Sequence, residues 1–158
     1  MHQLIYAAMT SHPSSTVIRA WARLAKAQQL AAGAIEQRLK SAGLPQLAWY
    51  DALLELERAG PAGLRPFELE RELLLSQCNL SRLIDRLESE QYVERRACEN
   101  DGRGQVIVIT AAGRAIRRRM WGVYGPAIQS VIGAHLSSAQ AAALDTALGT
   151  LISGTKAL

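Results

Sequence analysis

Polar side chains that can hydrogen-bond to nucleobases and phosphates recur between residues 76 and 90. Apolar residues between them, from Leu80 to Leu87, keep the spacing of one helix stripe, which predicts a helix from about Ser76 to Glu90. Ser76 is a favourable N-cap for this helix. Side chains of these types can pair with base edges in the major groove of DNA or with phosphates. The candidate contact residues are Ser76, Gln77, Asn79, Ser81, Arg82 and Arg86.

A second feature follows at once. A strand of about 93–97, a turn over 99–104 and a β-branched strand of about 105–110 predict a β-hairpin. Arg103 lies between two glycines near the tip, where its guanidinium suits a narrow, electronegative minor groove. Asp101 stands beside it, and phosphate repels a carboxylate. We therefore expect Arg103 to contact DNA and Asp101 to orient the hairpin through an arginine partner.

Helices position both features. Apolar spacing predicts helices over 14–41 and 46–58, a short helix from about Pro66, and a helix over 111–124 that Gly125-Pro126 kinks or breaks before it resumes to about residue 135. Ser137 and Gln140 form a capping box for a last helix. The short helix has Arg65 at its cap position instead of Ser or Thr, so we expect a weak cap.

Two short helices joined by a tight turn and followed directly by a hairpin predict a winged helix-turn-helix. The fold class is therefore mainly α with a small β-hairpin wing. In this arrangement one helix enters the major groove and the wing reaches the neighbouring minor groove. We call the helix of residues 76–90 the recognition helix and the hairpin the wing.

The composition fits one compact unit. With 158 residues, 49% hydrophobic and 20% charged, the chain is large enough for one core and too short for two typical domains. Its apolar runs are too short for a signal peptide or a membrane span, which predicts a cytoplasmic protein. The net charge of +4 tolerates a polyanionic partner, and the basic excess gathers between residues 91 and 119. We interpret Arg117–Arg119 as a solvated helix face.

The cysteines and histidines form no chemical site. Cys78 and Cys98 lack the spacing of a zinc site or a disulfide framework, and the three histidines are scattered. No nucleophile with a base, and no set of metal ligands, can be assembled, so we expect neither an enzyme nor a cofactor. One alternative remains, because oxidation of Cys78 or Cys98 could block DNA binding and make the protein a thiol-based redox regulator.

Six of the eight aromatic residues lie outside residues 63–116. They could line an apolar effector pocket between the DNA-binding region and the flanking helices, although core packing is the commoner role of such residues. Asp51 could face the same pocket, but we expect it to pair with an arginine. The candidate pocket residues are Trp21, Trp49, Tyr50, Asp51 and Trp121.

Residues 63–116 resemble the MarR family of bacterial transcription regulators. The resemblance lies in the LxxLIDRLExxxxVER run from Leu80 to Arg95, the Asp101-x-Arg103 pair, and the closing Ile107-x-Ile109-Thr110-x-x-Gly113. A weaker likeness covers nearly the whole chain. The sequence departs from the family at Glu70, Gln77 and Cys78, which affects the expected operator sequence and leaves the fold unchanged.

The resemblance implies a homodimer whose first and last helices, about 14–41 and 111–155, intertwine. Its two winged helix-turn-helix lobes, about 46–110, would bind a palindromic double-stranded operator, usually as a repressor released by a small molecule. The residues themselves support the dimer, because the terminal helices are too apolar to stand in solvent. We expect recognition helices about 34 Å apart, and an aromatic or phenolic effector.

Overall fold

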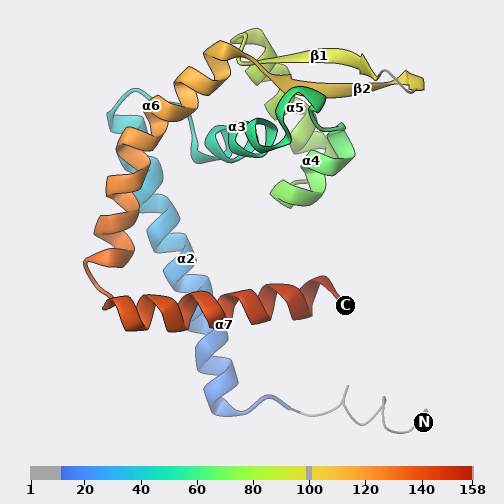
Figure 1. The fold of residues 1–158 in the computed structure, drawn as a ribbon. Coiled ribbons are helices and arrows are strands. Elements are labelled where there is room, and N and C mark those ends of the chain that lie inside the picture. Colours follow the sequence, from blue (N-terminus) through green and yellow to red (C-terminus); the bar gives the residue numbers. More distant parts are fainter. Residues whose placement is uncertain (1–11, 99–100, 158) are drawn as a thin grey trace, which may run out of the picture.

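The computed structural model describes residues 12–98 and 101–157, although of residues 101–103 only the backbone is described. Figure 1 shows a lobe of short helices with a hairpin, carried on long helices. The elements are α2 (Ser15–Ser41), α3 (Leu47–Ala59), a 3-10 turn (Gly60–Ala62), α4 (Pro66–Leu73), α5 (Gln77–Ser89), β1 (Val93–Cys98), β2 (Asp101–Ile109), α6 (Ala111–Ile128), a π-helical turn (Gln129–Gly133) and α7 (Ser138–Lys156). The predicted winged helix-turn-helix with its hairpin is confirmed.

The core lies inside the lobe. Side chains from α3, α4, α5 and the hairpin meet there, and the C-terminal end of α2 and one side of α6, from Ile116 to Ala127, close it. Burying these side chains is the main favourable term that holds the short helices together. The largest fully buried side chains are Leu39, Leu53, Leu56, Leu69, Leu80, Leu87, Ile107 and Met120.

Hydroxyl caps begin most of the helices where the sequence predicts them. The side chains of Ser14, Ser76, Thr110 and Ser137 each accept a backbone N–H from the first turn of the following helix. At α4 the cap works differently, because the Glu68 carboxylate accepts the backbone N–H of Arg65 at 2.7 Å. Half of a capping box is therefore present there without a hydroxyl at the cap position.

The wing is an antiparallel pair in which Val93 lies opposite Ile109. A register shift after Ala97 lets Cys98 pair with Asp101, so β2 begins several residues earlier than the sequence predicts. Close backbone contact ties the wing to the lobe. Gly63 has φ +66°, and a Cβ there would lie 2.4 Å from the Ile107 carbonyl oxygen, so only glycine fits.

The prediction for Gly125-Pro126 is only partly right. Helix α6 continues through Pro126 to Ile128, and the irregularity follows as the π-helical turn. Proline has no N–H, so one hydrogen bond of the helix is missing. The helical hydrogen bonds continue after it, because the Gln129 N–H donates to the carbonyls of Gly125 and Pro126. The distortion is absorbed in a widened turn and not in a break.

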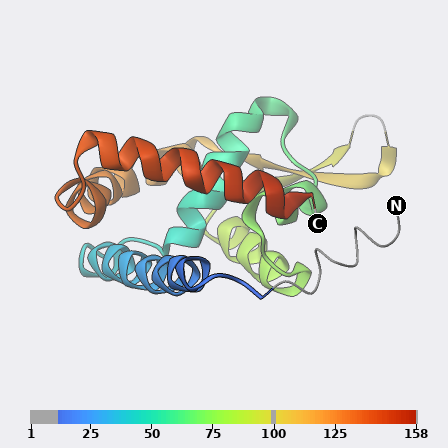
Figure 2. The same cartoon turned by 90° about the horizontal axis from the view of Figure 1, so that it is seen from below.

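The outer helices bury little of their apolar surface. Trp21 on α2 is 69% exposed, and no residue of α7 is buried. Figure 2, which views the molecule from below, shows α7 and the first half of α2 lying apart from each other. Neither helix, nor any other described one, is long and apolar enough to cross a membrane.

Candidate nucleic-acid interface

The turn between α4 and α5 fixes where the recognition helix begins. Leu74 adopts a left-handed conformation with φ 54°, which ends α4 sharply, and the Ser76 hydroxyl accepts the Asn79 N–H at 3.3 Å. Four residues of α5, from Leu80 to Leu87, are buried against the core. The remaining faces of the helix must therefore point away from the lobe.

The outward side of α5 carries most of the predicted contact residues. Gln77, Cys78, Ser81 and Arg82 are exposed and surround one shallow hollow of about 490 Å³. Within the described residues, none of these side chains makes a hydrogen bond or an ion pair. A free polar surface without internal partners can bind an external partner without first breaking protein contacts.

Ser76 and Asn79 are exposed as well, at the N-terminal end of α5. Part of their hydrogen-bonding capacity is already used, because the Ser76 hydroxyl caps the helix through the Asn79 N–H. Arg86 is exposed one turn beyond Arg82. The structure therefore brings all of the residues predicted on this helix to its exposed surface.

An ion-pair cluster joins the wing to the recognition helix. Arg95 of β1 donates to the Asp85 carboxylate at 2.6 Å and also contacts Glu88, both on α5. This cluster was not predicted, although the alternation of charges in "DRLE" and "VERR" could have suggested it. It holds Asp85 beside the wing, so that a carboxylate on the outward side of α5 is neutralised.

The wing tip can be followed only in part. The backbone of Asp101 and Arg103 belongs to β2, but their side chains lie outside the described residues. At the base of the wing, the Arg65 guanidinium lies 3.4 Å from the Cys98 sulfur. Cys78 and Cys98 are both free thiols, and Cys78 is the exposed one.

The three arginines of α6 differ in their surroundings. The side chain of Arg117 is 17% exposed, forms an ion pair with Glu57 of α3, and lies over the Tyr50 ring. Arg118 and Arg119 are exposed. The interpretation of this run as a solvated face is therefore wrong for Arg117, because the helical turn directs that residue toward α3.

The predicted effector residues fall into separate places. Tyr50 and Trp121 are stacked with ring centroids 6.0 Å apart, and Tyr124, another of the six aromatic residues outside 63–116, packs edge-on to Tyr50 at 4.9 Å. Trp49 contacts Tyr92 instead. Trp21 stands exposed on α2. Tyr50, Trp121 and Tyr124 therefore meet at the junction of α3 and α6, whereas Trp21 and Trp49 lie elsewhere.

Asp51 lies in acidic surroundings. Burial raises the pKa of its carboxyl group, and the nearby carboxylates of Glu55 and Glu36 raise it further. Burial, with Asp51 and Tyr50 as neighbours, likewise raises the pKa of Tyr124. In the described part of the chain Asp51 has no arginine partner, so that expectation is wrong. Arg117, which reaches α3 from α6, pairs with Glu57.

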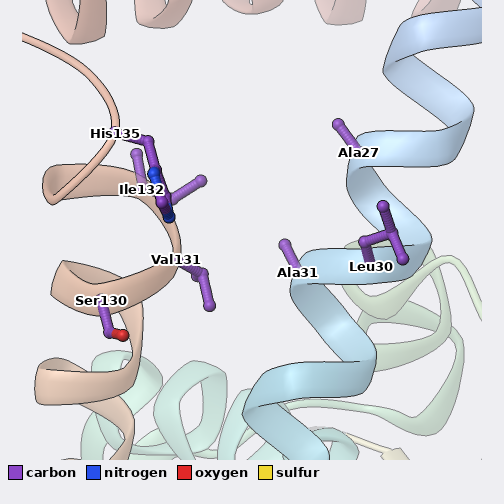
Figure 3. A pocket seen from close by; sticks show the side chains of 7 residues that line it. All are labelled: Ala27, Leu30, Ala31, Ser130, Val131, Ile132 and His135. Atoms are coloured by element: carbon purple, nitrogen blue, oxygen red, sulfur yellow. The ribbon is translucent and has the colours of Figure 1, made fainter.

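A groove lies between α2 and the π-helical turn, with a volume of about 400 Å³. Figure 3 shows side chains from α2 on one wall and from the turn on the other. At one end the Arg38 guanidinium donates to the Ser130 hydroxyl at 2.7 Å. Apart from one serine and one histidine, the walls are apolar; the lining residues are Ala27, Leu30, Ala31, Ser130, Val131, Ile132 and His135.

The family model described as "MarR family" matches residues 42–104. Among similar solved structures is Sco3205, a MarR family transcriptional regulator from Streptomyces coelicolor in complex with DNA. The TM-score is 0.81 at 23% identity, over 91% of this chain and 90% of that one. AbsC from the same organism has a TM-score of 0.79 at 24% identity, over 94% and 100%.

A third similar structure is a mutant MarR from E. coli complexed with operator DNA. Its TM-score is 0.75 at 25% identity, over 89% of this chain and 99% of that one. No curated protein matches the sequence. The resemblance predicted from residues 63–116 is confirmed, because the family model and these structures agree on it.

Proposed function

We propose that this chain is a MarR-family transcriptional regulator, and that it is a homodimeric repressor that binds a palindromic operator and is released by a small molecule. The observation that carries the proposal is the exposed polar side of α5, where Gln77, Ser81 and Arg82 have no hydrogen-bond or ion-pair partner among the described residues. Such a surface beside a wing suits the major groove of DNA. The DNA partner agrees with the expected cytoplasmic location.

The proposed contacts come from the recognition helix and the wing. On α5, amide, hydroxyl and guanidinium groups would meet base edges and phosphates, while Arg103 of the wing would enter the minor groove. Asp101 would orient the wing. The proposed DNA-binding residues are Ser76, Gln77, Asn79, Ser81, Arg82, Arg86 and Arg103.

The homodimer is supported by apolar surface that one chain leaves open. Leu30 on α2 is 65% exposed, and Leu151 and Ile152 on α7 are 50% and 56% exposed. The groove in Figure 3 adjoins this surface on α2. Large apolar side chains left exposed on both helices are typical of an interface. Residues 14–41 and 111–155 are therefore proposed as the dimerisation helices of a single domain, 1–158, whose residues 46–110 bind DNA.

The proposed effector is a small aromatic or phenolic molecule. The Tyr50, Trp121 and Tyr124 rings gather where the DNA-binding lobe meets α6, with Asp51 nearby. A molecule bound at this junction would change the angle between the lobe and the dimer helices. It would release DNA only to the extent that it binds the non-binding arrangement more tightly.

The test begins with selection of bound sequences from random duplexes, followed by titrations at several salt concentrations. We expect a palindromic site, and we expect Arg103→Ala to weaken binding and to lower the salt dependence by roughly one phosphate contact per protomer. A chain that stays monomeric and binds no duplex at low salt would overturn the proposal. Small aromatic acids are then screened for release of the selected duplex.

A second candidate is a thiol-based redox regulator. The observation that favours it is the free Cys98 thiol, whose sulfur lies 3.4 Å from the Arg65 guanidinium at the point where the wing meets the lobe. A peroxide would oxidise this thiol to a sulfenic acid with loss of water and would disturb that contact. Equal operator affinity before and after mild peroxide, for the parent and for Cys98→Ser and Cys78→Ser, would exclude it.

A further inference from the structure

We infer that the two exposed arginines of the recognition helix have different tasks. Arg82 recognises a guanine, whereas Arg86 acts together with Arg119 of α6 to hold a backbone phosphate. The inference rests on the proposed DNA binding and specifies which contacts determine the operator sequence. It also extends the DNA-binding surface to α6, outside the helix-turn-helix and the wing.

Arg82 belongs to the outward side of α5. It borders the hollow of about 490 Å³ together with Gln77, Cys78 and Ser81. These neighbours have short or neutral side chains, so a base edge can approach without meeting a carboxylate. The carboxylate that α5 carries on this side, Asp85, is held by Arg95. A guanidinium in such a place can donate two hydrogen bonds to the O6 and N7 atoms of guanine.

Arg86 faces a different surface. It lines a groove of about 420 Å³ between α5, the loop before α3, the start of the wing and α6. Arg119 lines the same groove from α6, and Trp49 and Tyr92 contribute to its wall. Neither arginine has an ion-pair partner among the described residues. The groove also contains Glu90, so its two positive charges exceed its negative charge by one.

The geometry of a helix in the major groove separates the two positions. Residues near the N-terminus of a recognition helix contact base edges, while later residues rise toward the groove edge. Arg86 lies one turn after Arg82, about 6 Å further along the axis. A pair of guanidinium groups from two elements suits a phosphate, which carries charge and accepts several hydrogen bonds.

Of the three consecutive arginines on α6, only Arg119 lines the groove with Arg86. Arg117 on the same helix already forms an ion pair with Glu57 and lies over the Tyr50 ring, so its guanidinium is not free to bind a phosphate. Arg118 is exposed but does not line the groove. Arg118 is therefore a matched control, since it has the same charge on the same helix and is exposed like Arg119.

The experiment measures binding of the full-length protein to its selected duplex and to every single-base variant of one half-site. Fluorescence anisotropy is recorded at several salt concentrations for the parent, Arg82→Ala, Arg86→Ala, Arg119→Ala and Arg118→Ala. Circular dichroism and size-exclusion chromatography confirm that each variant keeps the fold and oligomeric state of the parent. A variant that fails this check is replaced by the glutamine substitution at the same position.

We expect Arg82→Ala to lose the discrimination between guanine and other bases at one position per half-site, a loss of roughly ten- to hundredfold in the affinity ratio. We expect Arg86→Ala and Arg119→Ala to weaken all duplexes equally and to lower the salt slope by about one per protomer. Arg118→Ala should resemble the parent.

Three outcomes would overturn the inference while leaving DNA binding intact. The first is an Arg82→Ala variant that weakens every duplex by one factor with all base preferences retained. The second is an Arg86→Ala variant with a changed base preference, and the third is an Arg119→Ala variant that matches Arg118→Ala. If instead the parent protein binds no selected duplex at low salt, both the inference and the proposed function fail.

Discussion

The lobe around α5 and the outer helices α2 and α7 use similar apolar residues in opposite ways. Leu53, Leu56 and Leu69 are fully buried within the lobe. On α7, Leu151 and Ile152 are at least half exposed. The lobe buries these side chains against other residues of the same chain, whereas the outer helices leave theirs exposed to solvent. The difference indicates that the lobe folds by internal packing, and the exposed apolar side chains of the outer helices agree with the proposal that a second chain covers them.

The junction between the lobe and α6, which leads to α7, is built from an ion pair and aromatic contacts. Arg117 of α6 lies between Glu57 and the Tyr50 ring of α3, and Trp121 and Tyr124 cover the same ring. Partly buried ion pairs of this kind depend on their geometry. These contacts join residues of α3 and α6 that are far apart in the sequence.

The largest expected effect is in the lobe core. Leu53→Ala removes a fully buried side chain and leaves a cavity, so the free energy of unfolding should fall by about 2–5 kcal/mol. Urea denaturation at a fixed protein concentration measures this loss. The remaining folded protein should keep the parent's oligomeric state. A change below about 1 kcal/mol would contradict the description of the lobe as a self-contained core.

The next effect tests the outer helices. Leu151→Ala should leave the lobe intact but weaken self-association by roughly 2 kcal/mol or more, because a symmetric interface loses the side chain twice. Analytical ultracentrifugation measures the association constant, and operator binding should weaken with it. Unchanged self-association would remove α7 from the proposed interface.

A smaller effect tests the junction. Glu57→Gln removes the carboxylate that pairs with Arg117, a largely buried side chain. The free energy of unfolding should therefore fall by about 1–2 kcal/mol. The matched control is Glu55→Gln on the same helix, whose partner Arg58 is exposed, with an expected change below about 0.5 kcal/mol. Thermal denaturation of both variants decides the matter, and equal shifts would contradict a special role for Arg117.

The smallest effect concerns pH. The raised pKa of Asp51 means that its charged form is less favourable in the folded than in the unfolded chain. This lowers stability above the folded-state pKa and has no effect well below the usual carboxyl pKa. Asp51→Asn should therefore melt above the parent at neutral pH, and the advantage should vanish as the pH falls below about 4.

The exposed residue Glu72 provides the control for this experiment. Glu72→Gln should show no such pH-dependent gain in melting temperature. If Asp51→Asn melts below the parent at neutral pH, then Asp51 has a stabilising partner, and the acidic surroundings are not what determines its behaviour.

Local signals in the sequence predicted most of the elements. Helix α5 begins after Ser76 because a hydroxyl cap and an apolar stripe act within a few residues of each other. The same is true of α7 after Ser137. At Pro126 the local signal was misleading, because the helix on both sides remains hydrogen-bonded and carries the chain past the proline.

Partners far apart in the sequence could not be predicted in this way. The chain itself determined that α5 would have an apolar stripe and a polar outward side, because that pattern needs only helical spacing. Tertiary structure decided that Arg95 holds Asp85, that Arg117 joins Glu57, and that Trp49 and Tyr50 face different neighbours. Helical spacing fixes the direction of a side chain, but only the packing of elements distant in sequence fixes what it meets.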